Sequence, residues 1–160
     1  MVEIKLIDQI SSDVEEKMLT DIIKYEANHG IDVNYKRFCL TCADEHNEII
    51  GVLNAYTVFA EIYIDDLWID FKSRRKGFGK KLIYELEEHF KDKGFNNINL
   101  VTSAFQAPEF YIKCGYELEL TRNNPINPKL TKFFFVKYFK NKIQTQGILQ
   151  NSKKDDEIIE

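Results

Sequence analysis

The stretch Arg74-Arg75-Lys76-Gly77-Phe78-Gly79-Lys80-Lys81 places five cations around two glycines, immediately before a segment with helical periodicity. Backbone N–H groups at a helix start have no partner within the helix, and the helix dipole favours negative charge there. The glycines let the backbone approach a ligand closely and adopt turn conformations that other residues disfavour. The stretch, with nearby Lys72, therefore predicts an anion site suited to a pyrophosphate or polyphosphate.

Two well-known phosphate motifs do not match this loop. The nucleotide-binding G-x-x-x-x-G-K-[ST] pattern is absent, and in the dinucleotide pattern G-x-G-x-x-G the third glycine would fall at Leu82. Taken alone, the loop is equally compatible with a solvated basic turn that begins a helix.

The pattern around the loop predicts a mixed sheet with helices on its faces. Strands are expected at residues 2–7, 37–43, 48–59, 61–69, 97–103, 116–120 and 132–139, and helices at about 12–30, 79–93 and from Pro108. This order of hairpins and crossovers indicates the α/β (α+β) class, with a mostly antiparallel central sheet of about seven strands.

The first predicted helix begins with a capping box formed by Ser12 and Glu15, and Gly30 is its expected end. Its apolar residues form a helical stripe: Val14, Met18, Leu19, Ile22 and Ile23.

Composition describes an ordinary globular protein of 160 residues, 44% hydrophobic and 30% charged. We expect one domain over residues 1–140, followed by a polar, mobile tail over residues 141–160. The net charge of -4 argues against a general nucleic-acid binder. No apolar run suggests a membrane span or a signal peptide, and three cysteines do not form a disulfide scaffold. The expected location is therefore the reducing cytoplasm.

Three motifs together resemble the GNAT family of N-acetyltransferases. The loop at 74–79 is similar to the family's R/Q-x-x-G-x-G/A element, and Asp66-Leu67-Trp68-Ile69 to the end of its fourth strand. The segment 107–116, Ala-Pro-Glu-Phe-Tyr-Ile-Lys-Cys-Gly-Tyr, resembles its A-x-x-x-Y-x-K-x-G-F/Y element. The order of elements fits the family fold over about residues 1–140.

The resemblance implies acetyl-coenzyme A as cosubstrate, with its pyrophosphate on the loop amides. Its pantetheine arm would lie where the family's fourth and fifth strands splay apart. The implied cofactor-binding residues are Leu67, Trp68, Ile69, Arg74, Arg75, Lys76, Gly77, Phe78, Gly79 and Lys80, with Ser103 and Gln106 as candidates for one further contact. These two are considered because Ala104 stands where many relatives have asparagine.

The resemblance also implies direct acetyl transfer in a ternary complex, with an N–H of 67–69 stabilising the oxyanion. Tyr111 occupies the place of the family's general acid, although a packed core tyrosine is the alternative. Glu61 and Asp65 are candidate bases on one face of their strand, with Asp66 on the other unless a bulge shifts the register. They could equally be solvated edge charges.

The acceptor is left open by the sequence. In relatives its pocket is built from the regions corresponding here to residues 25–37 and 121–131, and the acidic strand favours a cationic amine such as a polyamine, an aminoglycoside or a peptide amine. A non-catalytic acyl-coenzyme A sensor and an adaptor for polyanions are the alternatives. Dimers are common among such folds, so a homodimer is compatible with the sequence.

No metal is expected in this protein. Cys39 and Cys42, with His46 nearby, have metal-like spacing, but positions 39 and 42 point to opposite faces of a strand. We therefore interpret these cysteines as buried apolar residues.

Overall fold

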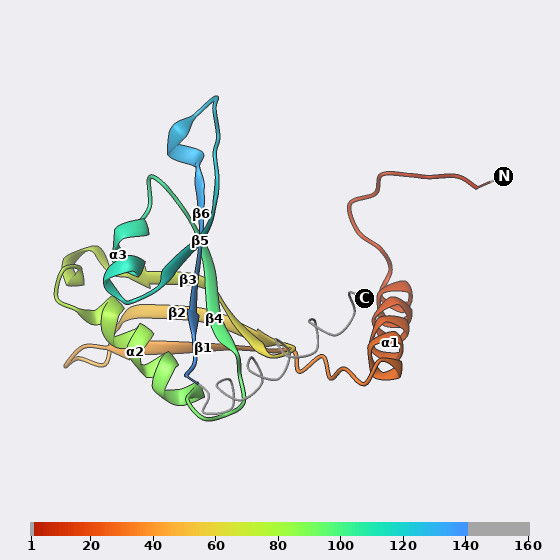
Figure 1. The fold of residues 1–160 in the computed structure, drawn as a ribbon, viewed down its shortest axis with the longest axis horizontal. Coiled ribbons are helices and arrows are strands. Elements are labelled where there is room, and N and C mark those ends of the chain that lie inside the picture. The colour runs from red at the N-terminus through yellow and green to blue at the C-terminus, as the bar shows by residue number, and fades with distance from the viewer. Residues whose placement is uncertain (1, 141–160) are drawn as a thin grey trace, which may run out of the picture.

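A six-stranded sheet organises the chain, and the computed structural model describes residues 2–140 (Figure 1). The strand order is β1-β2-β3-β4-β6-β5, and every neighbouring pair is antiparallel except the parallel pair β3–β4. The elements in chain order are α1 (Ser12–Asn28), β1 (Lys36–Ala43), β2 (Ile49–Val58), β3 (Glu61–Ile69), the 3-10 turn η1 (Phe71–Ser73), α2 (Phe78–Phe90), β4 (Asn97–Ser103), α3 (Pro108–Lys113), β5 (Glu117–Arg122), the 3-10 turn η2 (Pro128–Leu130) and β6 (Lys132–Tyr138).

The hydrophobic core lies on one face of the sheet, which we call the helix-covered face. Alternate strand residues point into it, including Leu53, Ile62, Leu100 and Phe135, all at most 3% exposed. The buried stripe of α2 packs onto them through Leu82, Ile83, Leu86 and Phe90. Packing α2 against β1, β2 and β3 fixes where this helix starts relative to the end of β3.

The opposite face carries no helix among residues 2–140, and we call it the open face. Strand pairing places these side chains on it: Val52, Asn54, Tyr56, Val58, Glu61, Tyr63, Asp66, Trp68, Asn99, Val101 and Phe134. Most are half-buried by their neighbours within the sheet, and Trp68 remains 46% exposed. This face of the sheet thus mixes aromatic and apolar side chains with carboxylates and carboxamides, and no helix of residues 2–140 covers it.

The two halves of the sheet separate partway along β3 and β4. These strands pair in parallel from Glu61–Asn97 to Ile64–Leu100, and beyond that point each continues alone. β3 stays with β2 up to Ile69, while β4 stays with β6 up to Ser103. The splay expected from the family resemblance is therefore present.

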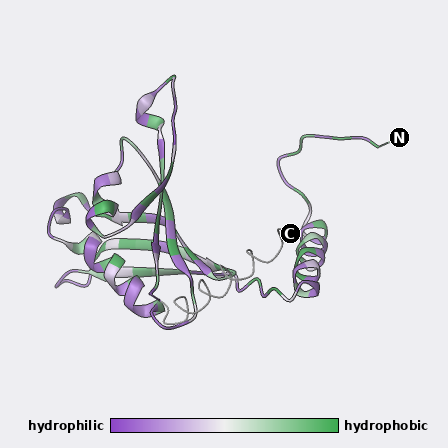
Figure 2. Cartoon of the chain, in the orientation of Figure 1, coloured by the Kyte–Doolittle hydropathy of each residue, from purple (hydrophilic) through white to green (hydrophobic). Residues whose placement is uncertain are grey.

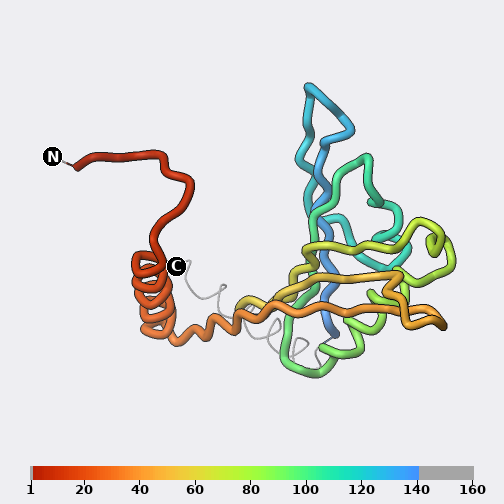
Figure 3. Tube along the Cα trace, turned by 180° about the vertical axis from the view of Figure 1, so that it is seen from behind, coloured from red at the N-terminus to blue at the C-terminus, as the bar shows by residue number. Residues whose placement is uncertain are grey.

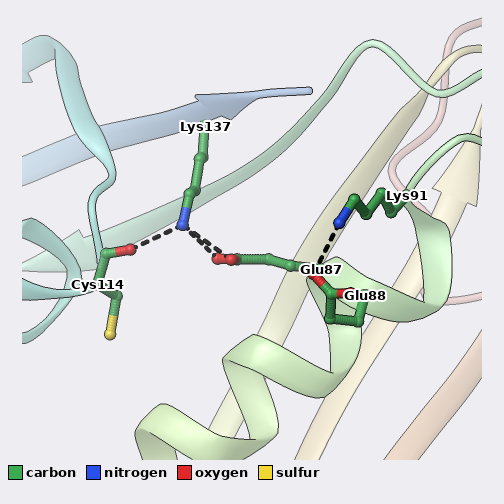
Figure 4. A network of polar contacts seen from close by, with 5 residues as sticks. All are labelled: Glu87, Glu88, Lys91, Cys114 and Lys137. Atoms are coloured by element: carbon green, nitrogen blue, oxygen red, sulfur yellow. Dashed lines mark hydrogen bonds and ion pairs between the residues drawn. The ribbon is translucent and has the colours of Figure 1, made fainter. Parts of the chain in front are cut away.

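A polar contact ties α2, α3 and β6 together behind this splay (Figure 4). The Lys137 ammonium donates to both carboxylate oxygens of Glu87 at 2.8 Å and to the Cys114 carbonyl at 2.9 Å. The Glu87 side chain is largely buried, so removal of Lys137 would leave its carboxylate without its ion-pair partner. By contrast, Glu88 and Lys91 form a looser, exposed pair at 3.5 Å.

The helix α1 stands apart from the sheet in both views of the chain (Figures 1 and 3). None of its residues is buried, and its apolar side chains Val14, Met18, Leu19, Ile22 and Ile23 are each about half exposed. Apolar and polar stretches alternate around the helix (Figure 2). The predicted stripe exists, but it packs on no core within the described residues.

Several expectations are corrected. Residues 2–7 form no strand, so the sheet has six strands instead of about seven, because no neighbouring strand lies there to pair with them. The cap of α1 is Ser11, whose side chain makes no cap bond, so the predicted capping box is wrong. Cys39 is exposed on the open face, so of the two cysteines predicted to be buried, Cys42 alone packs against the core. The predicted tail at 141–160 lies outside the described residues.

No helix among residues 2–140 is long and apolar enough to cross a membrane.

Candidate active site

The end of β3 and the start of α2 are joined by a loop that is fixed from within. The Asp70 carboxylate accepts a hydrogen bond from the Lys72 amide, and the Arg74 guanidinium donates through Nε to the Ile69 carbonyl at 2.9 Å. Arg74 also lies over the ring of Phe71. Arg74 thus holds the loop to the strand, which explains a basic residue here without any ligand.

The next residues carry the left-handed backbone of the loop. Arg75 has φ +62° and Gly77 has φ +85°, both in the left-handed region, and Gly77 is the N-cap of α2. Left-handed residues alternating with others form a concave nest of N–H groups that attracts anions. The amides of Phe78, Gly79 and Lys80 add the unpaired donors of the helix start. Two left-handed residues and the donors of a helix start thus lie within the loop for which the sequence predicts an anion site.

Gly79 has a different role from Gly77. A Cβ at Gly79 would come within 3.3 Å of Cζ of Phe110, which belongs to α3. The absence of a side chain lets α3 pack directly against the start of α2. This contact brings the tyrosine element beside the anion loop, although the two are about thirty residues apart in the sequence.

The cations of the loop have no acidic partners among residues 2–140. The salt bridges of this part of the chain include none of Lys72, Arg74, Arg75, Lys76, Lys80 and Lys81. Exposed cations gathered without counter-charges raise the local positive potential, in a chain whose net charge is -4. This potential would favour a ligand with several negative charges.

Tyr111 lies on α3 and is 8% exposed. Its ring packs near Phe110, Tyr116 and Phe135, with centroids 5.1, 6.1 and 6.1 Å away. Burial, with a smaller contribution from Cys114, raises the pKa of Tyr111 to about 12. The phenol therefore stays protonated at neutral pH, where it can donate a hydrogen bond or a proton and does not act as a phenolate base.

The acidic side chains of β3 do not alternate regularly between the two faces of the sheet. The register against β2 shifts so that Asp65 is the extra residue, with Ile64 opposite Ala55 and Asp66 opposite Asn54. Asp66 therefore lies on the open face with Glu61, which corrects the prediction that it lies on the other face. The prediction from strand alternation held only for a regular strand, and the bulge at Asp65 makes this strand irregular.

Each of these carboxylates has a different partner. Asp65 forms an ion pair with Arg37 on β1, and Asp66 accepts a hydrogen bond from the Asn54 amide. Glu61 accepts from Asn97 at 3.1 Å and Asn99 at 3.3 Å, at the beginning of β3. Six residues of extended strand, about 20 Å, separate Glu61 from Leu67, whereas Asp65 is only about 7 Å from it.

The remaining predicted cofactor residues flank the splay. Leu67 and Ile69 point to the helix-covered face, opposite Leu53 and Gly51, while Trp68 points to the open face. On the β4 side, the carboxamide oxygen of Gln106 accepts from the Ser103 amide at 2.8 Å. The Gln106 oxygen is thus occupied by a hydrogen bond at the end of β4, which leaves the NH2 group of Gln106 for a ligand.

A cluster of aromatic residues on the open face was missed in the sequence. Tyr56 lies 5.8 Å from Tyr35 and 5.2 Å from Tyr63 between ring centroids, and Arg37 lies over its ring. Tyr63 has a raised pKa because of burial and the neighbouring Tyr56 and Asp65. The sequence does contain a signal for this cluster: Tyr63 stands two residues from both Glu61 and Asp65, so alternation along the strand would place the three side chains on one face.

No group of three or more His, Cys, Asp or Glu side chains within residues 2–140 could hold a metal ion.

A splayed parallel strand pair, an amide nest and a buried tyrosine beside it define the class of acyl-coenzyme A-binding acetyltransferases. A family model, the acetyltransferase (GNAT) family, matches residues 5–116, more than half of the chain. The chain belongs to the GNAT family.

Individual relatives agree with this assignment. Blasticidin-S acetyltransferase from Streptomyces morookaense is 33% identical over 75 residues, 46% of this chain and 55% of that protein. The match thus spans about half the length of that curated relative. The crystal structure of an acetyltransferase from Bacillus cereus superposes with a TM-score of 0.69 at 28% identity, covering 84% of this chain and 98% of the other.

A second solved structure contains a ligand. The crystal structure assigned as a streptothricin acetyltransferase from Bacillus anthracis, in complex with acetyl coenzyme A, has a TM-score of 0.57 at 25% identity. It covers 65% of this chain and 63% of the other.

Proposed function

We propose that this chain transfers the acetyl group of acetyl-coenzyme A to a primary amine, by direct attack of the amine on the thioester while both are bound. The observation that carries the proposal is the gap that opens between β3 and β4 after Ile64 and Leu100, next to the amide nest at Gly77. A gap with unpaired backbone on both sides suits an amide-containing arm, and the nest suits the phosphates attached to it.

The donor fits the residues around this gap. The nest from Arg75 to Lys80 would receive the pyrophosphate, and the unpaired cations of the loop would balance its charge. The β4-facing backbone of Leu67, Trp68 and Ile69 would hydrogen-bond the arm, because β3 has no partner on that side beyond Ile64. The NH2 group of Gln106 would offer one side-chain contact at the opposite strand end.

Tyr111 would act on the leaving sulfur. A free thiol has a pKa of about 8.5, well below the value of about 12 for Tyr111. Complete proton transfer from the phenol to a thiolate would thus be uphill, so its contribution is a hydrogen bond to the charge that develops on sulfur. The general-acid role expected from the family becomes, in this environment, mainly electrostatic stabilisation.

No covalent intermediate on the protein is needed. Cys114 ends α3, the helix that carries Tyr111, and burial raises the pKa of its thiol. A thiol with a raised pKa is a poor nucleophile at neutral pH. Direct transfer to the bound amine is therefore the favoured route.

The base that deprotonates the amine is sought among the acids of β3. Asp65 and Asp66 lie at the splay, next to the backbone that would hold the thioester. Glu61, held by two asparagines at the strand start, could act there only through a chain of water molecules. We assign the direct role to the Asp65–Asp66 pair and the relayed role to Glu61.

A cationic acceptor is favoured by the open face. Glu61 and Asp66 share it with the Tyr56–Tyr63 pair, and Asp65 is ion-paired to Arg37, which lies over the Tyr56 ring. Carboxylates and aromatic faces both attract ammonium groups. Relatives named for blasticidin S and streptothricin make these two antibiotics natural members of an acceptor panel.

The test is a thiol-release assay with acetyl-coenzyme A and a panel of amines that includes these antibiotics, polyamines, aminoglycosides and peptides. We expect turnover with one amine class, reduced in the Asp65→Asn and Asp66→Asn variants at low and neutral pH. Calorimetry with acetyl-coenzyme A runs in parallel. Tight binding without turnover on any amine would favour a sensor, and no binding would refute the assignment of the loop.

A further inference from the structure

A buried ion pair behind Tyr111 has no part in the reaction steps proposed above. Lys137 of β6 directs its ammonium at three oxygens, both carboxylate oxygens of Glu87 at 2.8 Å and the Cys114 carbonyl at 2.9 Å (Figure 4). These oxygens match in number the three N–H donors of an ammonium. The side chains of Lys137 and Glu87 are only 33% and 18% exposed, so solvent screens this pair less than a surface ion pair.

The Cys114 carbonyl is the point where this ion pair meets α3. The helix has six residues, Pro108–Lys113, and Cys114 is its C-cap. A helix this short is not stable by itself, and the carbonyls at its C-terminal end have no partner within the helix. Lys137 supplies the donor for the Cys114 carbonyl from a neighbouring strand.

The turn that Lys137 holds also fixes the backbone of Tyr111. The Tyr111 carbonyl accepts hydrogen bonds from the Cys114 amide at 3.1 Å and from the Tyr116 amide at 3.0 Å. Along the chain, the Cys114 carbonyl lies between these two amides. The bond from Lys137 therefore restrains the same turn that restrains Tyr111.

The strand that carries Lys137 contacts the ring of Tyr111 as well. Phe135 lies two residues before Lys137 on β6, and both residues pair with core-facing residues of β4, so their side chains share the helix-covered face. The centroids of the Tyr111 and Phe135 rings are 6.1 Å apart. Thus β6 supports the ring of Tyr111 through Phe135 and the turn behind its backbone through Lys137.

Glu87 extends this support to α2. Its carboxylate comes from the helix whose first residues form the amide nest. Nearer its beginning, α3 packs against α2 where an added Cβ on Gly79 would lie 3.3 Å from the Phe110 ring. The helix that carries Tyr111 is therefore held to α2 by packing near one end and by the Lys137 bridge at the other.

We propose that Lys137 and Glu87 are positioning residues that keep the Tyr111 phenol beside the sulfur of coenzyme A on which charge develops. Lys137 acts through the turn at Cys114, and Glu87 acts by holding the Lys137 ammonium against that turn. Neither side chain needs to touch a substrate. The effect on the reaction rests on the proposed function, whereas the restraint that Lys137 places on α3 is measurable without any substrate.

The first experiment is a double-mutant cycle in the thiol-release assay, with the amine that the panel identifies. Lys137→Met should lower kcat about 10- to 100-fold, because a misplacement of about 1 Å can cost that much. KM, and the Kd for acetyl-coenzyme A, should stay within about twofold of the wild type. In a chain that already carries Tyr111→Phe, Lys137→Met should lower kcat less than about twofold further, because its effect passes through the phenol. Losses that multiply in the double variant, or an unchanged kcat in Lys137→Met, would overturn the proposal.

A second variant separates positioning from stability. Glu87→Leu combined with Lys137→Met replaces both members of the pair by apolar side chains, a change that is often neutral for a buried ion pair. The Cys114 carbonyl still loses its donor, so kcat should stay as low as in Lys137→Met alone. Recovery of kcat together with stability would mean that general destabilisation caused the loss, which contradicts a positioning role. As a control, Lys91→Met removes the exposed pair with Glu88 and should leave kcat within about twofold.

Hydrogen exchange of backbone amides tests the restraint without any reaction. The amides of Cys114 and Tyr116, both bonded to the Tyr111 carbonyl, should exchange at least about 10-fold faster in the Glu87→Leu/Lys137→Met chain than in the wild type. Unchanged exchange would refute the proposal, whether or not any amine is acetylated. Faster exchange, in a protein whose wild type acetylates no amine, would support the restraint on α3 and count against the proposed function instead.

Discussion

Replacing Gly77 by alanine tests whether the amide nest at the start of α2 is the phosphate site. Gly77 has φ +85°, and an added Cβ would find no heavy atom within 4 Å. The methyl group therefore causes no clash, and the whole cost is the left-handed backbone, about 1–2 kcal/mol for a residue with a Cβ. If the loop relaxes to avoid this cost, the nest is lost and the ligand must restore it.

Gly94 provides a matched control for this change. It also has φ +85° and open space around an added Cβ, but it lies beyond the other end of α2. We expect Gly77→Ala to raise the calorimetric Kd for acetyl-coenzyme A about 3- to 10-fold. Gly94→Ala should lower the free energy of unfolding by about 1–2 kcal/mol and leave Kd within about twofold of the wild type.

The control also defines the result that would refute the argument. An unchanged Kd in Gly77→Ala would mean that this backbone does not receive the phosphates. Equal increases of Kd in both variants would mean that affinity follows general stability instead of the local nest. Gly77→Asn adds a third point, because asparagine tolerates the left-handed region and should recover part of the affinity.

Three further predictions concern Tyr111 and Lys137. Tyr111→Phe should lower kcat about 10²- to 10³-fold while changing KM little, whereas the exposed Tyr84→Phe should change neither in the same thiol-release assay. The free energy of unfolding should fall as pH rises from about 10 to about 12, because the unfolded tyrosine loses its proton near 10 while folded Tyr111 keeps it to about 12. Urea titrations should show less of this fall in Tyr111→Phe, and an equal fall in both proteins would contradict the assignment. Lys137→Met should lower the free energy of unfolding, measured in urea, by about 2–3 kcal/mol, because it leaves the largely buried Glu87 carboxylate without a partner. Lys91→Met, which removes the exposed pair with Glu88, should lower it by less than about 0.5 kcal/mol. Equal losses in the two variants would mean that the buried pair stabilises the fold no more than the exposed pair.

Local patterns predicted most of the sheet. The strands at 61–69 and 97–103 were predicted with the bounds that the structure has, because β-branched and aromatic residues dominate both. The helix after the glycine loop was predicted within a few residues, because its buried stripe and Gly77 mark it clearly. The expected strand at residues 2–7 failed because a weak alternation says nothing about whether a partner strand exists.

The candidate site was less predictable where it depends on long-range pairing. The faces of Asp65 and Asp66 are set by the register against β2, which no local pattern contains. Arg74 and Gln106 were predicted as ligand contacts, yet both use part of their hydrogen-bonding capacity to close strand ends. The placement of α1 away from the sheet follows from bonds made by Val33 and Asn34, which sequence spacing does not reveal.

The bulge at Asp65 lies where the sheet opens. The extra residue turns Asp66 toward the open face, and β3 leaves β4 immediately before it. The sheet thus opens into two halves, β1-β2-β3 and β4-β6-β5, joined only along the first part of β3 and β4.

Donor and acceptor would therefore approach this opening from different sides. The nest of α2 and Tyr111 of α3 lie on the helix-covered side, while the carboxylates and tyrosines lie on the open face. A direct transfer requires the reacting groups of the two substrates to be in contact. The gap where β3 separates from β4 is the opening through which a group on one face of the sheet would reach a group on the other face. Removing the extra residue would restore regular pairing, which should close the gap and abolish coenzyme A binding while leaving the core of Leu53, Ile62 and Phe135 in place. Calorimetry and urea unfolding of a variant that lacks Asp65 would separate these effects, and retained coenzyme A affinity would show that the irregularity is not what opens the sheet.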